Sequence, residues 1–354
     1  MKALVLSGGT GTRLRPLSYS LAKQLVPLAN KPILVHCLEN IRAIGVDDVG
    51  IVVGDTAEQI RAVVGDGSDL GLRVTYIPQH SPLGLAHCVT VAADFLGDED
   101  FVMYLGDNVL PHGVADAANE FRNRRPAAQL LLKKVTDPGS YGVAEIDGDG
   151  RVVRLVEKPD GPSNDLAVMG VYFFTPAIHA AVRAIRRSAR GELEITDAIQ
   201  YLVDAGAPVA AQEYSGYWQD SGSPDNLLEC NRAMLRGITT DVNGGIDAES
   251  TVQGPVVVEP GARVIRSHLV GPVVVGADSV VRDSTVGPNT SLGRACVIEA
   301  AGVADSVLLE GVRVQGVGRL SGSVIGRSAV VVGHSEHAPH RLIIGDHTRA
   351  EVAA

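Results

Sequence analysis

A short run of small residues near the start of the chain could hold a phosphate. It lies between Ser7 and Thr12 and includes Gly8, Gly9 and Gly11. Such small side chains let a ligand lie directly against the backbone, and the amides of such a loop form a concavity that attracts anions. The apolar residues directly before the loop predict a buried strand, so the loop is expected at the end of a strand.

Two cations follow this loop. Arg13 closes it, and Lys23 stands ten residues later. A guanidinium can bind a phosphate through two parallel hydrogen bonds and an ammonium is a compact point charge, so both suit a polyphosphate. The glycines alone would suit a simple turn equally well. The loop lacks the Gly-Lys-Ser/Thr ending of a P-loop, and Leu14 stands where a dinucleotide-binding loop has a glycine or an alanine.

The full string around the loop is more specific than its glycines. Residues 8–18 read GGTGTRLRPLS, and residues 23–32 read KQLVPLANKP. Both strings resemble the signature of the sugar-1-phosphate nucleotidylyltransferases. Within that family the chain is most similar to members that transfer a thymidylyl group from dTTP to glucose 1-phosphate. The resemblance implies an in-line, magnesium-assisted reaction that releases pyrophosphate, and a place in nucleotide-sugar and deoxysugar synthesis.

An aspartate stands at the expected end of a later strand. Residues 101–105 are apolar and run directly into Gly106 and Asp107. Ligands of parallel α/β sheets collect at the carboxyl ends of the strands, which would bring this carboxylate near the glycine loop. Magnesium takes one or two such carboxylates together with substrate phosphates, whereas the plainer interpretation is a helix cap or a turn. The resemblance implies that Asp107 and Asp220 are the two Mg²⁺ ligands.

The stretch 128–174 is richer in strand pattern and is expected to supply a second wall of the site. Within it, Glu157 could accept hydrogen bonds from sugar hydroxyls, and Lys158 could neutralise a phosphate. The alternative for these two residues is an exposed ion pair at a strand end.

The resemblance implies roles for three sets of residues. Those expected to carry the reaction are Arg13, Lys23, Asp107, Lys158 and Asp220. Those expected around the nucleotide are Leu6, Ser7, Gly8, Gly9, Gly11, Thr12, Arg13, Gln24, Gln79, Gly84 and Asp107. Those expected around the sugar phosphate are Tyr141, Gly142, Glu157, Lys158, Val168 and Arg190. A glutamine can offer a donor and an acceptor to the imide edge of thymine, and it suits uracil equally well.

Short apolar strands alternate with helical patterns in the first part of the chain. Strands are expected over residues 3–6, 49–53, 73–77 and 101–105, and helices over residues 33–44, 56–64 and 85–95. This alternation predicts a Rossmann-like α/β fold with a mainly parallel sheet. A helix is also expected to follow the string at residues 190–197, whose acidic residues suit a helix start.

From about residue 242 the pattern changes to a period of six. Aliphatic residues stand at positions 252, 258, 264 and 270, and after a slip of four at 274, 280, 286, 292 and 298. This period predicts a parallel β-helix whose coils share one core, and the resemblance implies the left-handed type. We therefore expect a catalytic domain over residues 1–240 and a β-helix domain over residues 241–354. Flat stacked faces associate readily, so we expect a homo-oligomer, with a trimer as one candidate.

Size and composition limit the classes of function. The chain has 354 residues and a formal net charge of −10, which argues against a nucleic-acid partner. Four widely spaced cysteines without a Cys-x-x-Cys pair suggest buried thiols in a reducing compartment. No signal peptide and no membrane-spanning run of apolar residues are recognisable. We therefore expect a cytoplasmic enzyme that contacts no membrane.

Three alternatives stay open from the sequence. The chain could use UTP or another sugar phosphate with the same chemistry. It could be bifunctional, with an acetyltransferase tail in which His268 or His334 acts as the base, although both histidines could simply be polar residues on the β-helix. Last, it could be a regulatory or scaffold subunit without activity, which damaged motifs would favour; no damaged motif is found.

Overall fold

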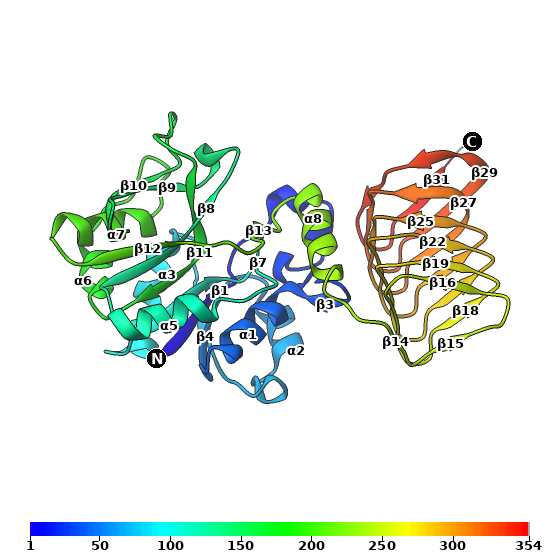
Figure 1. Ribbon diagram of the computed structural model, residues 1–354, viewed down its shortest axis with the longest axis horizontal. Coiled ribbons are helices and arrows are strands. Elements are labelled where there is room, and N and C mark those ends of the chain that lie inside the picture. The colour runs from blue at the N-terminus through cyan, green and yellow to red at the C-terminus, as the bar shows by residue number, and fades with distance from the viewer. Residues whose placement is uncertain (353–354) are drawn as a thin grey trace. The chain divides into compact units, whose positions relative to one another are not determined.

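The computed structural model describes the backbone of residues 1–352 and the side chains of residues 1–333 and 339–352 (Figure 1). The chain forms two compact units. The first contains Met1–Gly9 and Leu34–Trp218, and the second contains Thr10–Ile33 and Gln219–Ala354. The domain boundary at residue 240 stays a prediction, whereas the chain passes from one compact unit to the other after Gly9, after Ile33 and after Trp218.

The first unit is built on a nine-stranded sheet with the order β10-β9-β11-β6-β1-β4-β5, in which β8 pairs with β11 and β12. Its strands are β1 (Lys2–Leu6), β4 (Asp48–Val53), β5 (Arg73–Pro78), β6 (Phe101–Leu105), β8 (Ala128–Lys134), β9 (Gly142–Ile146), β10 (Val152–Glu157), β11 (Leu166–Phe174) and β12 (Val209–Glu213). The helices of this region are α1 (Ile33–Ala43), α2 (Ala57–Val64), α3 (Leu85–Val91), α4 (Ala93–Leu96), α5 (Ala115–Arg124), α6 (Ile178–Ala184) and α7 (Ile195–Asp204). The predicted α/β fold is therefore confirmed.

Strand β1 lies in the interior of this sheet and is parallel to both neighbours. Val5 pairs with Ile51 of β4 on one side and with Tyr104 of β6 on the other. Residues 3–6 are all buried, as expected for a strand covered on both faces by other elements. Because the three strands are parallel and in register, their carboxyl ends lie at one edge of the sheet.

The stretch 128–174 forms the strand-rich region that its sequence predicts. Strand β11 is antiparallel to β6 and to β8, and β9 and β10 form an antiparallel pair at the edge of the sheet. The parallel half and this antiparallel half thus share one sheet.

The second unit contains a parallel β-helix, whose stacked coils run from yellow to red in Figure 1. Parallel partners lie 17 residues apart in the first coils, as Val258 with Val275 and Val275 with Leu292. All three side chains are fully buried and belong to one continuous apolar core. The predicted parallel β-helix is thus confirmed, although these coils have 17 residues, one fewer than three exact repeats of six, and the left hand of the coil stays a prediction.

The β-helix strands have two or three residues each, apart from three longer ones near the end of the chain. They are β14 (Asp241–Val242), β15 (Gly245–Ile246), β16 (Thr251–Gln253), β17 (Val256–Val258), β18 (Arg263–Ile265), β19 (His268–Val270), β20 (Val273–Val275), β21 (Val280–Arg282), β22 (Thr285–Val286), β23 (Thr290–Leu292), β24 (Val297–Glu299), β25 (Gly302–Ala304), β26 (Val307–Leu308), β27 (Arg313–Ser321), β28 (Val324–Ile325), β29 (Val330–His340), β30 (Ile343–Ile344) and β31 (Arg349–Val352). Shorter elements elsewhere are β2 (Pro27–Leu28), β3 (Lys31–Pro32), β7 (Asn108–Val109), β13 (Gln219–Asp220) and α8 (Pro224–Leu235).

Helix α8 packs against the β-helix within the second unit. Ser223 caps its first turn by accepting a hydrogen bond from the Asn226 amide at 3.2 Å, and Pro224 takes the first helical position. Further along, Arg232 Nε donates to Asp305 Oδ1 at 2.6 Å. A helix bonded in this way is a fixed extension of the β-helix.

All four cysteines are buried and none forms a disulfide. Burial raises the pKa of the Cys88 and Cys296 thiols to about 12. These thiols are therefore protonated and act as small core residues, as the sequence predicts.

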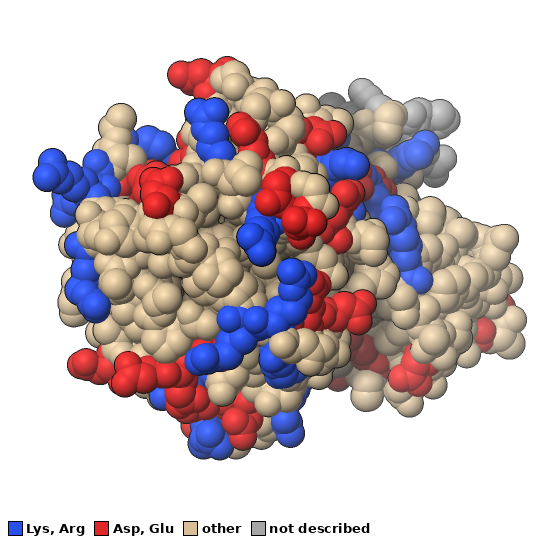
Figure 2. Space-filling view, turned by 60° about the vertical axis from the view of Figure 1, so that its left-hand side comes forward, with Lys and Arg blue, Asp and Glu red and all other residues tan. Residues whose placement is uncertain are grey.

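Charges of opposite sign are mixed over the surface. On the face shown in Figure 2, basic and acidic side chains lie among one another. Exposed ion pairs such as Arg73–Asp47 and Arg124–Glu120 contribute to this mixing. A net charge of −10 thus leaves room for a locally basic site. Among residues 1–352, the helices are all too short or too polar to cross a membrane.

The close stacking of the coils gives a test of the fold. A Cβ atom on Gly276 would lie 2.5 Å from the carbonyl carbon of Gly293 on the next coil. We expect Gly276→Ala to lower the free energy of unfolding by about 1–3 kcal/mol through overpacking. In urea titrations, Gly148→Ala is the control because nothing lies within 4 Å of its added Cβ. Equal midpoints for the two variants would contradict the stacking.

Candidate active site

The glycine loop leaves the end of β1 against the neighbouring strand. The Ser7 amide donates to the Val52 carbonyl at 2.9 Å. A Cβ on Gly8 would lie 3.2 Å from Gln79 Oε1, and a Cβ on Gly54 would lie 3.2 Å from the Gly8 carbonyl oxygen. The backbone approach thus requires small residues here, and it places two predicted nucleotide residues, Gly8 and Gln79, side by side.

The side chain of Gln79 is oriented by a residue that the sequence did not reveal. Gln79 Nε2 lies 3.0 Å from His87 Nδ1, eight residues along the chain in α3. Burial, followed by the charge of Arg187, lowers the pKa of His87 below its usual value of 6.5. The neutral ring can accept from the Gln79 amide, which leaves the Gln79 oxygen directed elsewhere.

Gly84 stands where the chain enters α3. Its φ of +105° is open mainly to glycine, and a Cβ there would lie 2.4 Å from the Leu193 carbonyl oxygen. The Leu193 amide donates to the Leu83 carbonyl at 2.7 Å, and the Ala86 amide donates to the Leu193 carbonyl at 3.0 Å. This turn is therefore fixed to the segment that precedes α7.

Asp107 follows β6 at the same sheet edge as the glycine loop. The Gly106 amide donates to the Leu6 carbonyl at 3.0 Å, which ties the ends of β6 and β1 together. Asp107 Oδ1 accepts from Asn108 Nδ2 at 3.2 Å. The buried Trp218 indole N–H donates to Asn108 Oδ1 at 2.6 Å. Trp218 is thus both a core residue and the hydrogen-bond donor that orients Asn108, which the sequence did not single out.

Three residues expected around the hexose converge on one point. A Cβ on Gly142 would lie 3.4 Å from Glu157 Oε2 and 3.8 Å from Val168 Cγ2. The same Cβ would lie 2.8 Å from Thr196 Cγ2, so Thr196 joins this cluster. Lys158 has a φ of +38°, and such backbone strain in a non-glycine residue tends to occur at binding sites.

The Glu157 carboxylate has several partners of its own. Thr196 Oγ1 donates to its Oε2 at 3.1 Å, and Arg190 Nη1 donates to its Oε1 at 3.2 Å. Burial, and then the charge of Glu194, raises the pKa of Glu157 above its ordinary 4.5. Arg190 also lies 3.5 Å from the buried Glu194. The structure therefore places Arg190 in a carboxylate cluster, and Thr196 and Glu194 are two members that sequence reasoning missed.

In the second unit, the cations that follow the loop lie next to other predicted site residues. Arg13 Nη2 lies 3.7 Å from Asp220 Oδ1. A Cβ on Gly11, which has a φ of +64°, would lie 3.0 Å from Lys23 Cβ. The Arg13 side chain is 71% exposed against 16% for Asp220, so the guanidinium can meet a ligand.

Two predicted nucleotide residues hold buried polar atoms without a partner. Ser7 Oγ and Gln24 Oε1 are two of only four such side-chain atoms among the residues whose side chains are described. Leaving a buried polar atom unpaired costs about 1–3 kcal/mol, so each such atom calls for an explanation. One such explanation is a ligand that supplies the missing hydrogen bonds.

The comparisons with known proteins identify the family of the chain. Residues 2–237 match the family model described as nucleotidyl transferase. The chain belongs to the nucleotidyl transferase family. It is 54% identical over 356 residues to a glucose-1-phosphate thymidylyltransferase of Streptomyces griseus, with 100% of both chains covered. It is 52% identical to a protein of that name from Streptomyces antibioticus, with 99% of both covered.

A solved structure of similar fold supports the family. It is described as a putative glucose-1-phosphate thymidylyltransferase from Bacillus anthracis and is 31% identical, with a TM-score of 0.63. The match covers 68% of the present chain and 97% of the other. The resemblance inferred from the motifs is therefore confirmed, and the chain is an enzyme of the nucleotidyl transferase class.

Nucleotidyl transferases generally use a divalent metal, and the donor chemistry here fits one. No cluster of three or more histidines, cysteines, aspartates or glutamates that could hold a metal occurs within the described part of the chain. Asp107 and Asp220 each offer hard carboxylate oxygens. Magnesium is typically held by one or two carboxylates plus substrate phosphates, and either of these carboxylates has the donor chemistry for that role.

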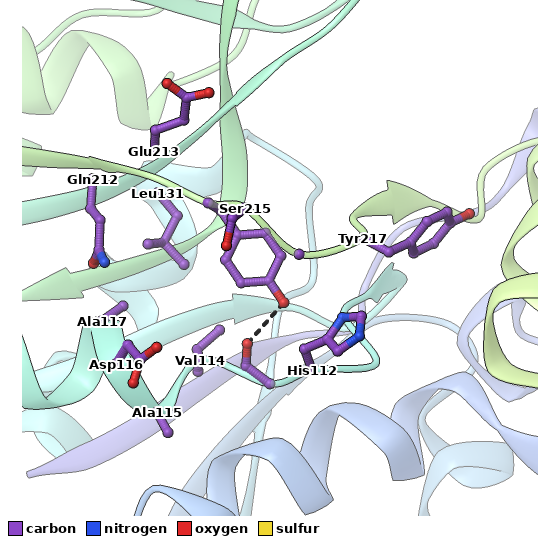
Figure 3. A pocket seen from close by; sticks show the side chains of 13 residues that line it. His112, Val114, Ala115, Asp116, Ala117, Leu131, Gln212, Glu213, Ser215 and Tyr217 are labelled. Carbon is purple, nitrogen blue, oxygen red and sulfur yellow. Dashed lines mark hydrogen bonds between the residues drawn. The ribbon is translucent and has the colours of Figure 1, made fainter. Parts of the chain in front are cut away.

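The nucleotidyl transferase also has a cavity that none of the predicted site residues lines. It has a volume of about 490 Å³ and lies between the start of α5 and residues 212–217 (Figure 3). Tyr214 Oη donates to the Gly113 carbonyl at 3.0 Å across it, and burial raises the pKa of Tyr214 to about 12. Figure 3 shows His112 and Tyr217 on its wall.

The acetyltransferase alternative finds little support at His268. His268 Nδ1 is hydrogen-bonded to Thr251 Oγ1, and the two residues pair in the β-ladder of adjacent coils. The histidine thus has the environment of a polar residue on a β-helix coil. The other candidate, His334, has a side chain outside the described ones.

Proposed function

We propose that this nucleotidyl transferase transfers a thymidylyl group from dTTP to glucose 1-phosphate, with dTDP-glucose and pyrophosphate as products. The observation that carries the proposal is the identity above 50% along the full chain to two enzymes of that name. The convergence of Gly142, Glu157 and Val168, all expected around the hexose, supports it.

The reaction is a single in-line phosphoryl transfer. A phosphate oxygen of glucose 1-phosphate attacks the α-phosphorus of dTTP, and the bond from that phosphorus to the bridging oxygen of pyrophosphate breaks. No covalent enzyme intermediate is needed, so catalysis rests on positioning and on charge stabilisation. Arg13 and the amides of the glycine loop stabilise the leaving pyrophosphate. Lys23 and Lys158 hold the reacting phosphates.

Asp107 and Asp220 are the residues proposed to hold Mg²⁺. When bound, the ion neutralises nucleotide phosphate charge. Around the other substrate, Glu157 accepts hydrogen bonds from the sugar hydroxyls, and Thr196 keeps that carboxylate oriented. The missing Cβ of Gly142 lets the Thr196 methyl group pack close to the backbone beside Glu157.

The base is read by Gln24 and Gln79. Each amide side chain can pair with the imide edge that thymine and uracil share, so UTP is the second candidate nucleotide.

Copies of the chain are also proposed to associate into a homo-oligomer through the β-helix.

The direct test is pyrophosphate release by the purified protein with magnesium and glucose 1-phosphate. The proposal expects a clear preference for dTTP over UTP, ATP and GTP. Comparable rates with UTP would widen the function to both pyrimidine nucleotides. No release with any of the four would overturn the proposed reaction.

Arg13 gives a prediction about the leaving group. Removing one preorganised charge-stabilising contact costs about 3 kcal/mol, or about a hundredfold in rate, and we expect this loss in kcat for Arg13→Ala. Steady-state kinetics would measure it. Arg15→Ala is the matched control, because Arg15 lies in the same loop and stacks on the exposed Tyr19. Unchanged turnover of the Arg13 variant would remove this residue from the mechanism.

Glu157 gives a prediction about pH. Its pKa is raised above 4.5, so on acidification it takes up a proton at a higher pH than an ordinary glutamate does. Because only the carboxylate accepts hydrogen bonds at both oxygens, the KM for glucose 1-phosphate should rise as the pH falls through this raised pKa.

Glu157→Gln should remove that inflection, because an amide does not titrate, while raising KM at neutral pH. The substrate phosphate titrates near pH 6 for every variant, so the comparison between variants isolates Glu157. Glu145→Gln, a carboxylate on the neighbouring strand paired with Arg154, is the control. An identical KM profile in the wild type and the Glu157 variant would contradict the assignment.

A further inference from the structure

The segment that carries Arg13 and Lys23 is bonded to the β-helix at two places. The first anchor on the β-helix side involves Asn30, whose Nδ2 donates to the Leu292 carbonyl at 2.8 Å. Next to it, the Ala29 amide donates to Asn231 Oδ1 of α8 at 2.9 Å, and Ser291 Oγ donates to the same oxygen at 2.8 Å. This end of the segment is therefore fixed to the coils around β23.

The second anchor lies at Ser20, between Arg13 and Lys23 in sequence. Ser20 Oγ donates to Asp346 Oδ2 at 2.8 Å, a contact between residues 326 positions apart. Arg327 Nε donates to the same carboxylate oxygen at 3.0 Å, and its Nη2 donates to the Ser20 carbonyl at 3.3 Å. Beside them, a Cβ on Gly345 would lie 3.4 Å from Pro16 Cβ, so the coil and the segment are in contact.

Asp346 differs from the other acidic residues that pair with arginine on the β-helix. Its side chain is 6% exposed, and its Oδ1 also accepts from the Arg327 amide at 2.6 Å. The Arg266–Asp283 pair, by contrast, is 49% and 47% exposed and joins two coils of the β-helix. A shielded carboxylate that accepts from three donors has one fixed position, whereas an exposed ion pair contributes little to stability.

The structure between this anchor and the glycine loop is closely packed. Leu14 and Leu17, which belong to two consecutive 3-10 helices, are fully buried. Ser18 Oγ donates to the Gly11 carbonyl at 2.7 Å, and Gly11 packs on Lys23. A shift at Ser20 would therefore move the part of the loop that carries the cations.

We propose that Asp346 is a positioning residue for the pyrophosphate-binding loop, so that the last coils of the β-helix hold Arg13 and Lys23 in their reactive place. This inference rests on the proposed function of Arg13. It gives the β-helix a part in the reaction in addition to any part in assembly. The residue acts through the Ser20 and Arg327 contacts and touches neither substrate.

The test is a double-mutant cycle on the full chain. Asp346→Ala should lower kcat/KM for dTTP by about tenfold, below the ~10²-fold that a 1 Å misplacement can cost. In an Arg13→Ala background the same change should cost clearly less than about tenfold, because the part of the effect that acts through Arg13 is already lost and only the part through Lys23 remains. Asp283→Ala, which breaks a β-helix ion pair away from the segment, should change kcat/KM by less than about twofold in either background.

A second readout does not depend on activity. Hydrogen–deuterium exchange of amides in residues 12–26 should be faster in Asp346→Ala and in Ser20→Ala than in the wild type or in Asp283→Ala. Ser20→Ala leaves the Arg327–Asp346 pair in place, so this variant still tests the proposal if Asp346→Ala folds poorly. Unchanged exchange in Ser20→Ala, or an equal loss of kcat/KM in both backgrounds, overturns the proposal. An inactive wild type with the expected exchange changes would instead overturn only the proposed function.

Discussion

The pairing of β1 with a parallel neighbour on each side is the constraint on which the first unit depends. Because β1 lies between β4 and β6, the loops that leave these three strands emerge at one sheet edge. The backbones come so close there that a Cβ on Gly106 would lie 3.1 Å from the Leu6 carbonyl oxygen. Glycine at positions 8, 54 and 106 is thus a consequence of strand packing. The same close packing leaves a bare-backbone loop where a phosphate can be held.

The second unit constrains the later part of the phosphate-binding motif, from Thr10 onward. The chain leaves the first unit after Gly9, so the motif that is continuous in sequence is divided between two compact bodies. Arg13, Lys23 and Asp220 belong with the β-helix, whose coils form a single apolar core. A β-helix is stiff because every coil is hydrogen-bonded to the next, and a segment bonded to it at Ser20 and Asn30 shares that stiffness. Preorganised charge of this kind is what phosphoryl transfer needs.

Much of the fold could be predicted because its signals are local and periodic. The apolar strands of the sheet and the period of six in the β-helix are both readable from neighbouring residues. The two strings at residues 8–18 and 23–32 were specific enough to indicate the family, and Gly142, Glu157 and Val168 do lie together. The role of each of these residues in catalysis is still a prediction.

The residues that sequence reasoning missed share a physical reason. His87, Asn108 and Thr196 each act by orienting another side chain, and their types and spacing carry no chemical signature. Asp346 is an extreme case, since its partner Ser20 lies near the other end of the chain. Such contacts depend on how distant segments pack. Likewise, the sequence suggested that Arg190 approaches the sugar phosphate, whereas its carboxylate neighbours became visible only in the structure.

The most direct measurement is the crystal structure of the protein with dTDP-glucose and magnesium. We expect the diphosphate, which consists of the two phosphates that reacted, to lie next to Lys23 and Lys158, with the glucose ring over Gly142 and its hydroxyls bonded to Glu157. The thymine should then pair with Gln24 and Gln79. A product bound only in the cavity beside Tyr214, with the glycine loop and Glu157 free of it, would contradict the account.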